Sequence, residues 1–153
     1  NGVLGESAVG TVTIDTDDTA SVTGLAGTSA VGSVTISANI TTYTVTVATG
    51  TNSYGTGNKF YIDGSVSPTL TLTEGNTYRF DQSDSSNSTH PLRFSTTANG
   101  THGGGSEYTT GVTTNGTPGS SGAYTQITVA SGAPTLYYYC TNHSGMGGQA
   151  NTP

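Results

Sequence analysis

Charged side chains are scarce in this chain of 153 residues, and cations are the scarcest of them. Asp, Glu, Lys and Arg make up 8% of the residues, the formal net charge is −6, and Lys59, Arg79 and Arg93 are the only Lys and Arg side chains. Both nucleic-acid binding and attachment to an anionic membrane need clusters of basic residues, because they depend on neutralising many phosphates. We therefore expect no nucleic-acid partner and no membrane partner.

Long apolar runs and a basic, apolar signal segment are also missing. No stretch approaches the roughly 20 apolar residues that cross a bilayer as a helix. The chain begins with Asn1 instead of Met, so the missing signal segment does not decide the compartment. Thr, Ser and Gly dominate the composition, which is typical of secreted and virion-surface β proteins. We therefore expect an extracellular or virion-surface location.

Side chains with sulfur or imidazole groups are rare as well, and three of these five residues lie close together in the sequence. The chain has one Cys, one Met and three His, and Cys140, His143 and Met146 fall within seven residues. One cysteine excludes an internal disulfide and leaves three roles: pairing with another chain, binding a metal, or packing as a small apolar residue. The neighbouring His143 and Met146 favour the metal.

A thiolate, imidazoles and a thioether together form a ligand set for one copper ion. Sulfur donors suit Cu(I) and imidazole suits both oxidation states, so a rigid mixed site binds either with little rearrangement. Ser144 and the glycines that follow it allow the tight turn that would gather Cys140, His143 and Met146. A second imidazole is available at His90, which precedes an apolar run. The predicted metal ligands are therefore His90, Cys140, His143 and Met146.

Two other groups of chemically capable residues favour simpler interpretations. His102 lies in a glycine-rich stretch, and a position on the surface is the better interpretation for it than a spare ligand. Asp15, Asp17 and Asp18 lack the Gly and the distal Glu of a calcium-binding EF-hand loop. We interpret them as a solvated turn.

The N-terminal part of the chain contains an internal repeat. Residues 5–14 (GESAVGTVTI) return as residues 27–36 (GTSAVGSVTI), an offset of 22 residues. Each copy alternates apolar and hydroxyl side chains between glycines, which predicts short strands. Repeat units of this kind bury little surface alone and are stable as arrays of three or more. We therefore expect residues 1–40 to be a Gly/Thr-rich β-repeat segment, either the end of a longer array or an assembly arm.

A second pattern begins near Thr41 and continues to the C-terminus, which predicts a separate domain over residues 41–153. Runs of period-two alternation predict half-buried strands, and they cover residues 43–47, 70–72, 78–80, 92–95, 124–129 and 136–140. In the last run Leu136, Tyr138 and Cys140 share one face, so the thiol is expected to point inward. No segment has a helical period, and polar loops are expected over residues 81–88 and 100–122. The sequence therefore predicts an all-β domain, a β-sandwich.

This domain resembles the cupredoxin, or blue-copper, family. The resemblance is carried by His90 with the short apolar strand after it, and by an aromatic strand that ends in Cys140-x-x-His143-x-x-Met146. It implies a Greek-key β-sandwich with copper at one end, His90, Cys140 and His143 in the equatorial plane and Met146 as the axial ligand. One position departs from the family. The residue after the first histidine is usually an Asn whose backbone N–H donates to the cysteine sulfur, and here it is Pro91, which has no N–H.

The chain also resembles structural proteins of marine cyanobacterial phages, in its Ser-Ala-Val-Gly-Ser-Val-Thr repeat and in the segment from Phe80 to Gly148. This resemblance implies a virion component such as a fibre, a knob or a capsid decoration, whose partners are other structural subunits or copies of itself. The first hypothesis is therefore a structural surface module built on a cupredoxin-like domain. The alternative is a soluble type 1 copper protein that transfers electrons to a redox partner.

Enzymatic function has little support in the sequence. Three histidines cannot supply the trinuclear centre of a multicopper oxidase, and no Ser-His-Asp arrangement or acid pair stands out. We therefore expect that the protein is not an enzyme.

Overall fold

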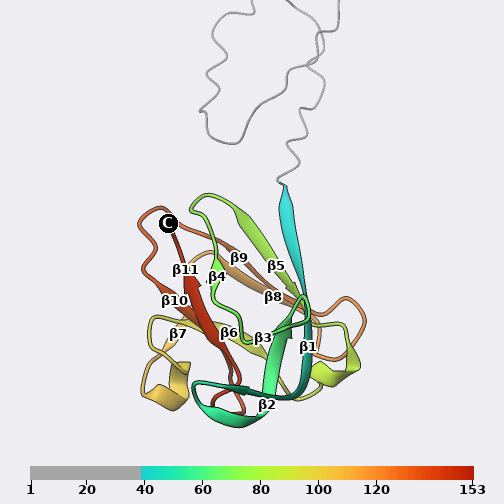
Figure 1. The fold of residues 1–153 in the computed structure, drawn as a ribbon. Helices are drawn as coiled ribbons and strands as arrows, with labels where there is room; N and C mark the ends of the chain where they lie inside the picture. Colours follow the sequence, from blue (N-terminus) through green and yellow to red (C-terminus); the bar gives the residue numbers. More distant parts are fainter. Residues whose placement is uncertain (1–38) are drawn as a thin grey trace, which may run out of the picture. The chain divides into compact units, whose positions relative to one another are not determined.

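The computed structural model describes residues 39–153, which form a β-sandwich of two mixed sheets (Figure 1). The predicted repeat segment, apart from residues 39 and 40, lies outside the described residues. The described part of the chain contains no α-helix and two short 3-10 helices, η1 (Ser85–Asn87) and η2 (Gly100–Gly103). In residues 39–153 no helix is long and apolar enough to cross a membrane.

The two sheets contain six and five strands. The first has the order β3 (Ser65–Val66), β2 (Gly55–Ile62), β1 (Ile40–Asn52), β5 (Thr77–Asp81), β9 (Tyr124–Thr128) and β8 (Val112–Asn115). The second has the order β4 (Leu70–Thr71), β11 (Gly148–Asn151), β10 (Leu136–Cys140), β6 (Leu92–Ser95) and β7 (Glu107–Tyr108). The pairs β1–β5 and β11–β4 are parallel and the other pairs are antiparallel. The chain crosses repeatedly from one sheet to the other, so neighbouring strands are often distant in sequence.

The core lies between the sheets and is built from alternate residues of the longer strands. Phe80 of β5 and Phe94 of β6 are fully buried, and their rings meet edge to face with centroids 5.4 Å apart. Edge-to-face contacts of this kind add about 0.5–1.5 kcal/mol to the burial of the rings. In β10, Leu136, Tyr138 and Cys140 are buried on the core side, which confirms the predicted inward direction of the thiol.

Strand positions predicted from period-two alternation are largely confirmed. The expected strands at residues 92–95 and 136–140 coincide with β6 and β10, and those at 43–47, 78–80 and 124–129 overlap β1, β5 and β9. The predicted polar loop over residues 100–122 is wrong, because it contains η2, β7 and β8. β7 and β8 are short edge strands rich in Thr and other polar residues, so they carry little apolar alternation.

Candidate metal centre

Three of the predicted metal ligands meet where two neighbouring strands end. Cys140 is the last residue of β10, and His90 lies two residues before the first residue of β6. The antiparallel register pairs Cys140 with Leu92, so the end of β10 lies next to the start of β6. His143 follows three residues after Cys140 in the loop 141–147, hereafter the ligand loop. Strand pairing therefore joins residues that are 50 positions apart in the sequence.

The donor atoms have separations that suit one metal ion. Cys140 Sγ lies 3.8 Å from His90 Nδ1 and 3.7 Å from His143 Nδ1. One donor atom from each of the three residues lies within 4.8 Å of the others. With metal–sulfur and metal–nitrogen bonds of about 2.3 and 2.0 Å, a trigonal angle places nitrogen and sulfur about 3.7 Å apart. His90, Cys140 and His143 can therefore hold a metal ion.

Burial favours the neutral forms of two of the three clustered side chains, His90 and Cys140. Cys140 is fully buried and His90 is 8% exposed, whereas His143 lies at the surface. Burial lowers the pKa of His90, and the neighbouring His143 imidazole lowers it further. Burial raises the pKa of the Cys140 thiol, an effect that the backbone N–H groups of Asn142 and His143 partly offset by donating to the sulfur. Both shifts favour neutral side chains at neutral pH, so metal binding requires the thiol to lose its proton.

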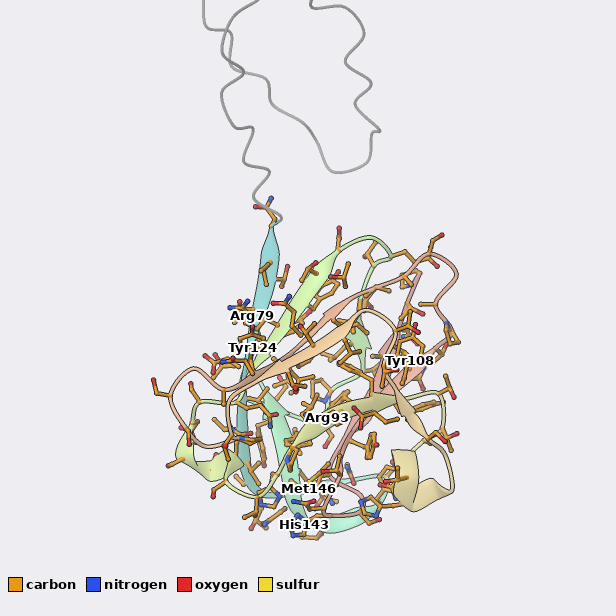
Figure 2. All side chains as sticks on the ribbon, turned by 180° about the vertical axis from the view of Figure 1, so that it is seen from behind. Arg79, Arg93, Tyr108, Tyr124, His143 and Met146 are labelled. Carbon is orange, nitrogen blue, oxygen red and sulfur yellow. The ribbon has the colours of Figure 1, made fainter. Side chains whose placement is uncertain are left out.

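Met146, the fourth predicted ligand, is buried in the same region. Its side chain is 1% exposed, and Figure 2 shows it at the same end of the domain as His143. The Met146 carbonyl accepts hydrogen bonds from the backbone N–H of Phe60 at 2.9 Å and from the Ser67 hydroxyl at 3.0 Å. These bonds attach the ligand loop to β2 and to the residue that follows β3.

Two further side chains hold the ligand loop from the side of β1 and β2. The Asn52 amide donates to the carbonyls of Gly145 and Gly147 at 3.1 and 3.2 Å. The Lys59 ammonium, only 3% exposed, donates to the Gly145 carbonyl at 2.8 Å. A buried cation is costly unless it is paired or well hydrogen-bonded, and the Gly145 carbonyl supplies such a hydrogen bond to the buried Lys59 ammonium. Neither residue has a sequence signal, because both lie far from the loop along the chain.

Two more asparagine side chains, Asn99 and Asn142, also hold the ligand loop. Asn99 accepts from the backbone N–H of Gly145 at 2.7 Å and donates to the Ser144 hydroxyl at 2.8 Å. Asn142 donates to the Thr89 carbonyl at 2.9 Å, which joins the ligand loop to the segment that carries His90. Side chains from several elements thus fix the loop before any ion binds, and a fixed loop is what keeps ligand geometry constant.

His102, the third histidine, is exposed, as predicted, and it also contacts the site. Its Nε2 lies 3.0 Å from the Cys140 carbonyl oxygen, and its ring lies edge-on to Tyr139. It is not one of the three clustered donors. The contact depends on how η2 packs on β10, which no local pattern in the sequence reports.

Comparisons with known proteins add no relative: no family model matches the chain, and no curated protein matches it significantly.

Proposed function

We propose that this domain is a cupredoxin-like, Greek-key β-sandwich that binds one copper ion, and that it serves as a structural module of an extracellular or virion surface. The observation that supports the metal site best is the buried Cys140 sulfur, which lies 3.8 and 3.7 Å from two imidazole nitrogens. His90, Cys140 and His143 would hold the ion, with the Met146 thioether as a weak fourth ligand. When bound, copper would supply a one-electron centre.

Copper is favoured over zinc by the donor set. Structural zinc sites are usually held by four Cys and His side chains, whereas three such donors cluster here, in the described residues. One thiolate, two imidazoles and a weak thioether form the blue-copper set.

The structural role is supported by composition and by the repeat. A chain with 8% charged residues, many hydroxyl side chains and a sequence repeat of residues 5–14 at 27–36 suits an assembly whose partners are other subunits or copies of itself. The exposed His143 favours the alternative function, electron transfer, because its imidazole edge offers a short route from a buried ion to a redox partner.

The test is to titrate the full chain with Cu(II) and, separately, with Zn(II). We expect an intense thiolate-to-copper charge-transfer band and a rise in Tm with copper. If neither the band nor the rise in Tm appears, the copper proposal is wrong. For the structural role, electron microscopy of the native particle should find the protein on a repeating lattice or fibre. Recovery of the protein only as a free monomer would contradict that role and favour the electron carrier.

Pro91 is expected to keep the reduction potential of a bound copper low. Proline cannot donate a backbone hydrogen bond, so the Cys140 thiolate keeps more electron density for Cu(II). Pro91→Ala supplies the missing N–H, and a hydrogen bond worth about 1 kcal/mol corresponds to a rise of about 40 mV for one electron. Electrochemistry of the copper-loaded chain measures the shift, with Pro134→Ala, away from the site, as the control. An unchanged or lower potential in Pro91→Ala would contradict this account.

Copper binding is expected to strengthen with rising pH. Because burial raises the pKa of Cys140, the free thiol is protonated at neutral pH, and forming the thiolate releases one proton. Above about pH 7 ordinary imidazoles are neutral, so the thiol dominates and the apparent affinity is expected to rise up to about tenfold per pH unit. Competition against a chelator of known affinity between about pH 7 and 8 measures the slope. A flat profile would mean that no thiol proton is released.

A further inference from the structure

A cavity lies beside the ligand loop, whose Gly147 forms part of its lining. It has a volume of about 380 Å³, within the range of small-molecule sites. It is lined by Thr51, Asn52, Ser53, Tyr54, Val66, Ser67, Thr69, Tyr137, Gly147, Gly148 and Gln149. Figure 1 shows the β1–β2 turn close to the segment that leads into β11, and the cavity lies where these elements meet.

The lining has no charge and has exposed apolar faces. None of its side chains is Asp, Glu, Lys, Arg or His. Tyr54 and Val66, at 46% and 37% exposure, are two of the three large hydrophobic residues that are exposed in residues 39–153. The third, Ile40, lies at the start of β1, outside the cavity. Two of the three exposed large hydrophobic residues of the described chain therefore line this otherwise polar cavity.

Hydrogen-bonding groups surround these apolar faces. The hydroxyls of Ser53, Tyr54, Thr69 and Tyr137 make no hydrogen bond to another residue of the described part of the chain. The Gln149 amide donates to Asn151 at 2.7 Å, which leaves its carbonyl oxygen as an acceptor. Hydroxyls donate and accept, so the lining can match a ligand that carries many hydroxyls.

The wall of the cavity is fixed in advance. Asn52 accepts from the Tyr54 backbone N–H at 2.9 Å and donates to Ser67 Oγ at 3.1 Å, and Ser67 in turn donates to the Met146 carbonyl. At Gly148 a Cβ would lie 2.7 Å from the Tyr138 hydroxyl and 2.8 Å from the Ser67 carbonyl, so the floor allows no side chain there. A pre-formed wall lowers the entropic cost of binding.

We propose that this cavity binds a neutral saccharide. A sugar ring offers an apolar C–H face for Tyr54 and Val66 and a rim of hydroxyls for the surrounding hydroxyl and amide groups. The uncharged lining disfavours phosphates, uronic acids and charged peptides, because it supplies no counter-charge for them. The proposal does not depend on copper: none of His90, Cys140, His143 and Met146 lines the cavity.

The test applies the full chain, without metal, to an array of neutral and acidic oligosaccharides. Neutral glycans that bind are then titrated by calorimetry against wild type, Tyr54→Ala, Tyr54→Phe and the control Ile40→Ala, which removes exposed apolar surface outside the cavity. Losing the ring is expected to weaken binding about tenfold, equivalent to about 1.4 kcal/mol. Tyr54→Phe, which removes only the hydroxyl, is expected to weaken it less, and Ile40→Ala is expected to stay within about twofold. Thermal melts check that each variant is folded.

Three results would overturn the proposal. In the first, no neutral glycan binds; in the second, only acidic glycans bind; in the third, Tyr54→Ala binds neutral glycans with the affinity of the wild type. Success or failure here is separate from the copper titration, which has its own spectroscopic readout.

Discussion

Cys140→Ser is expected to abolish the copper charge-transfer band completely and to remove the stabilisation that copper gives the wild-type chain. The band comes from the thiolate, and serine offers only a hydroxyl of similar size at a fully buried position. A ligand at about 1,000 times its Kd stabilises a folded protein by about 4 kcal/mol, so the loss is readily seen as a missing rise in Tm. Absorption spectra and thermal melts with and without Cu(II) measure both effects.

The matched control for this substitution is His102→Ala. His102 is exposed and contacts the Cys140 carbonyl. Its removal therefore tests whether the loss of any side chain that contacts Cys140 is enough to weaken copper binding. We expect His102→Ala to keep the band and the rise in Tm. A band that persists in Cys140→Ser would show that copper binds elsewhere. A band lost in His102→Ala would show that copper binding requires His102, which is not one of the proposed ligands.

Gly147→Ala is expected to destabilise the metal-free chain by about 3 kcal/mol, near the upper end for overpacking. A Cβ at Gly147 would overlap the Tyr138 carbonyl oxygen and lie 3.1 Å from Tyr139 Cα. Both neighbours are backbone atoms of β10, so no rotamer change relieves the overlap, and either the ligand loop or the strand must shift. Urea unfolding of the full chain measures the free energy.

Gly104→Ala separates this steric effect from backbone strain. Gly104 has a φ of +83° and nothing within 4 Å of an added Cβ, so alanine there adds only the cost of the left-handed conformation, about 1–2 kcal/mol. A smaller loss of stability in Gly147→Ala than in Gly104→Ala would mean that the loop yields easily. The ligand loop would then not be the rigid support that its hydrogen bonds indicate.

Local pattern in the sequence was sufficient to group Cys140 with His143, because they are separated by two residues and a tight turn brings them together. His90 was added as an available second imidazole and by the resemblance to the cupredoxin family, and the pairing of its strand with that of Cys140 is seen only in the structure. The alternation in β6 and β10 is strongly apolar, which made both strands visible. The β-sandwich could be predicted for the same reason.

The support around the ligands could not be predicted in this way. Asn52 and Lys59 reach the ligand loop from the β1–β2 hairpin, whose contact with the loop depends on the packing of the whole domain. The strand β2 begins with the polar stretch Gly55-Thr56-Gly57-Asn58, and β11 is Gly-Gln-Ala-Asn, so neither has the apolar alternation that identifies a strand. Side chain-to-backbone bonds of this kind depend on register and are invisible to local pattern.

The position of Asn52 has a thermodynamic consequence. Its amide group belongs to the wall of the cavity and, through the Gly145 and Gly147 carbonyls, to the loop that carries His143 and Met146. Any ligand that changes the freedom of this one side chain changes the free energy of the loop, and linkage is reciprocal. If a metal and a saccharide both bind as proposed, the factor by which an occupied cavity alters metal affinity must equal the factor by which a bound metal alters affinity in the cavity. Asn52, together with Ser67 and Gly147, is where such a coupling would act.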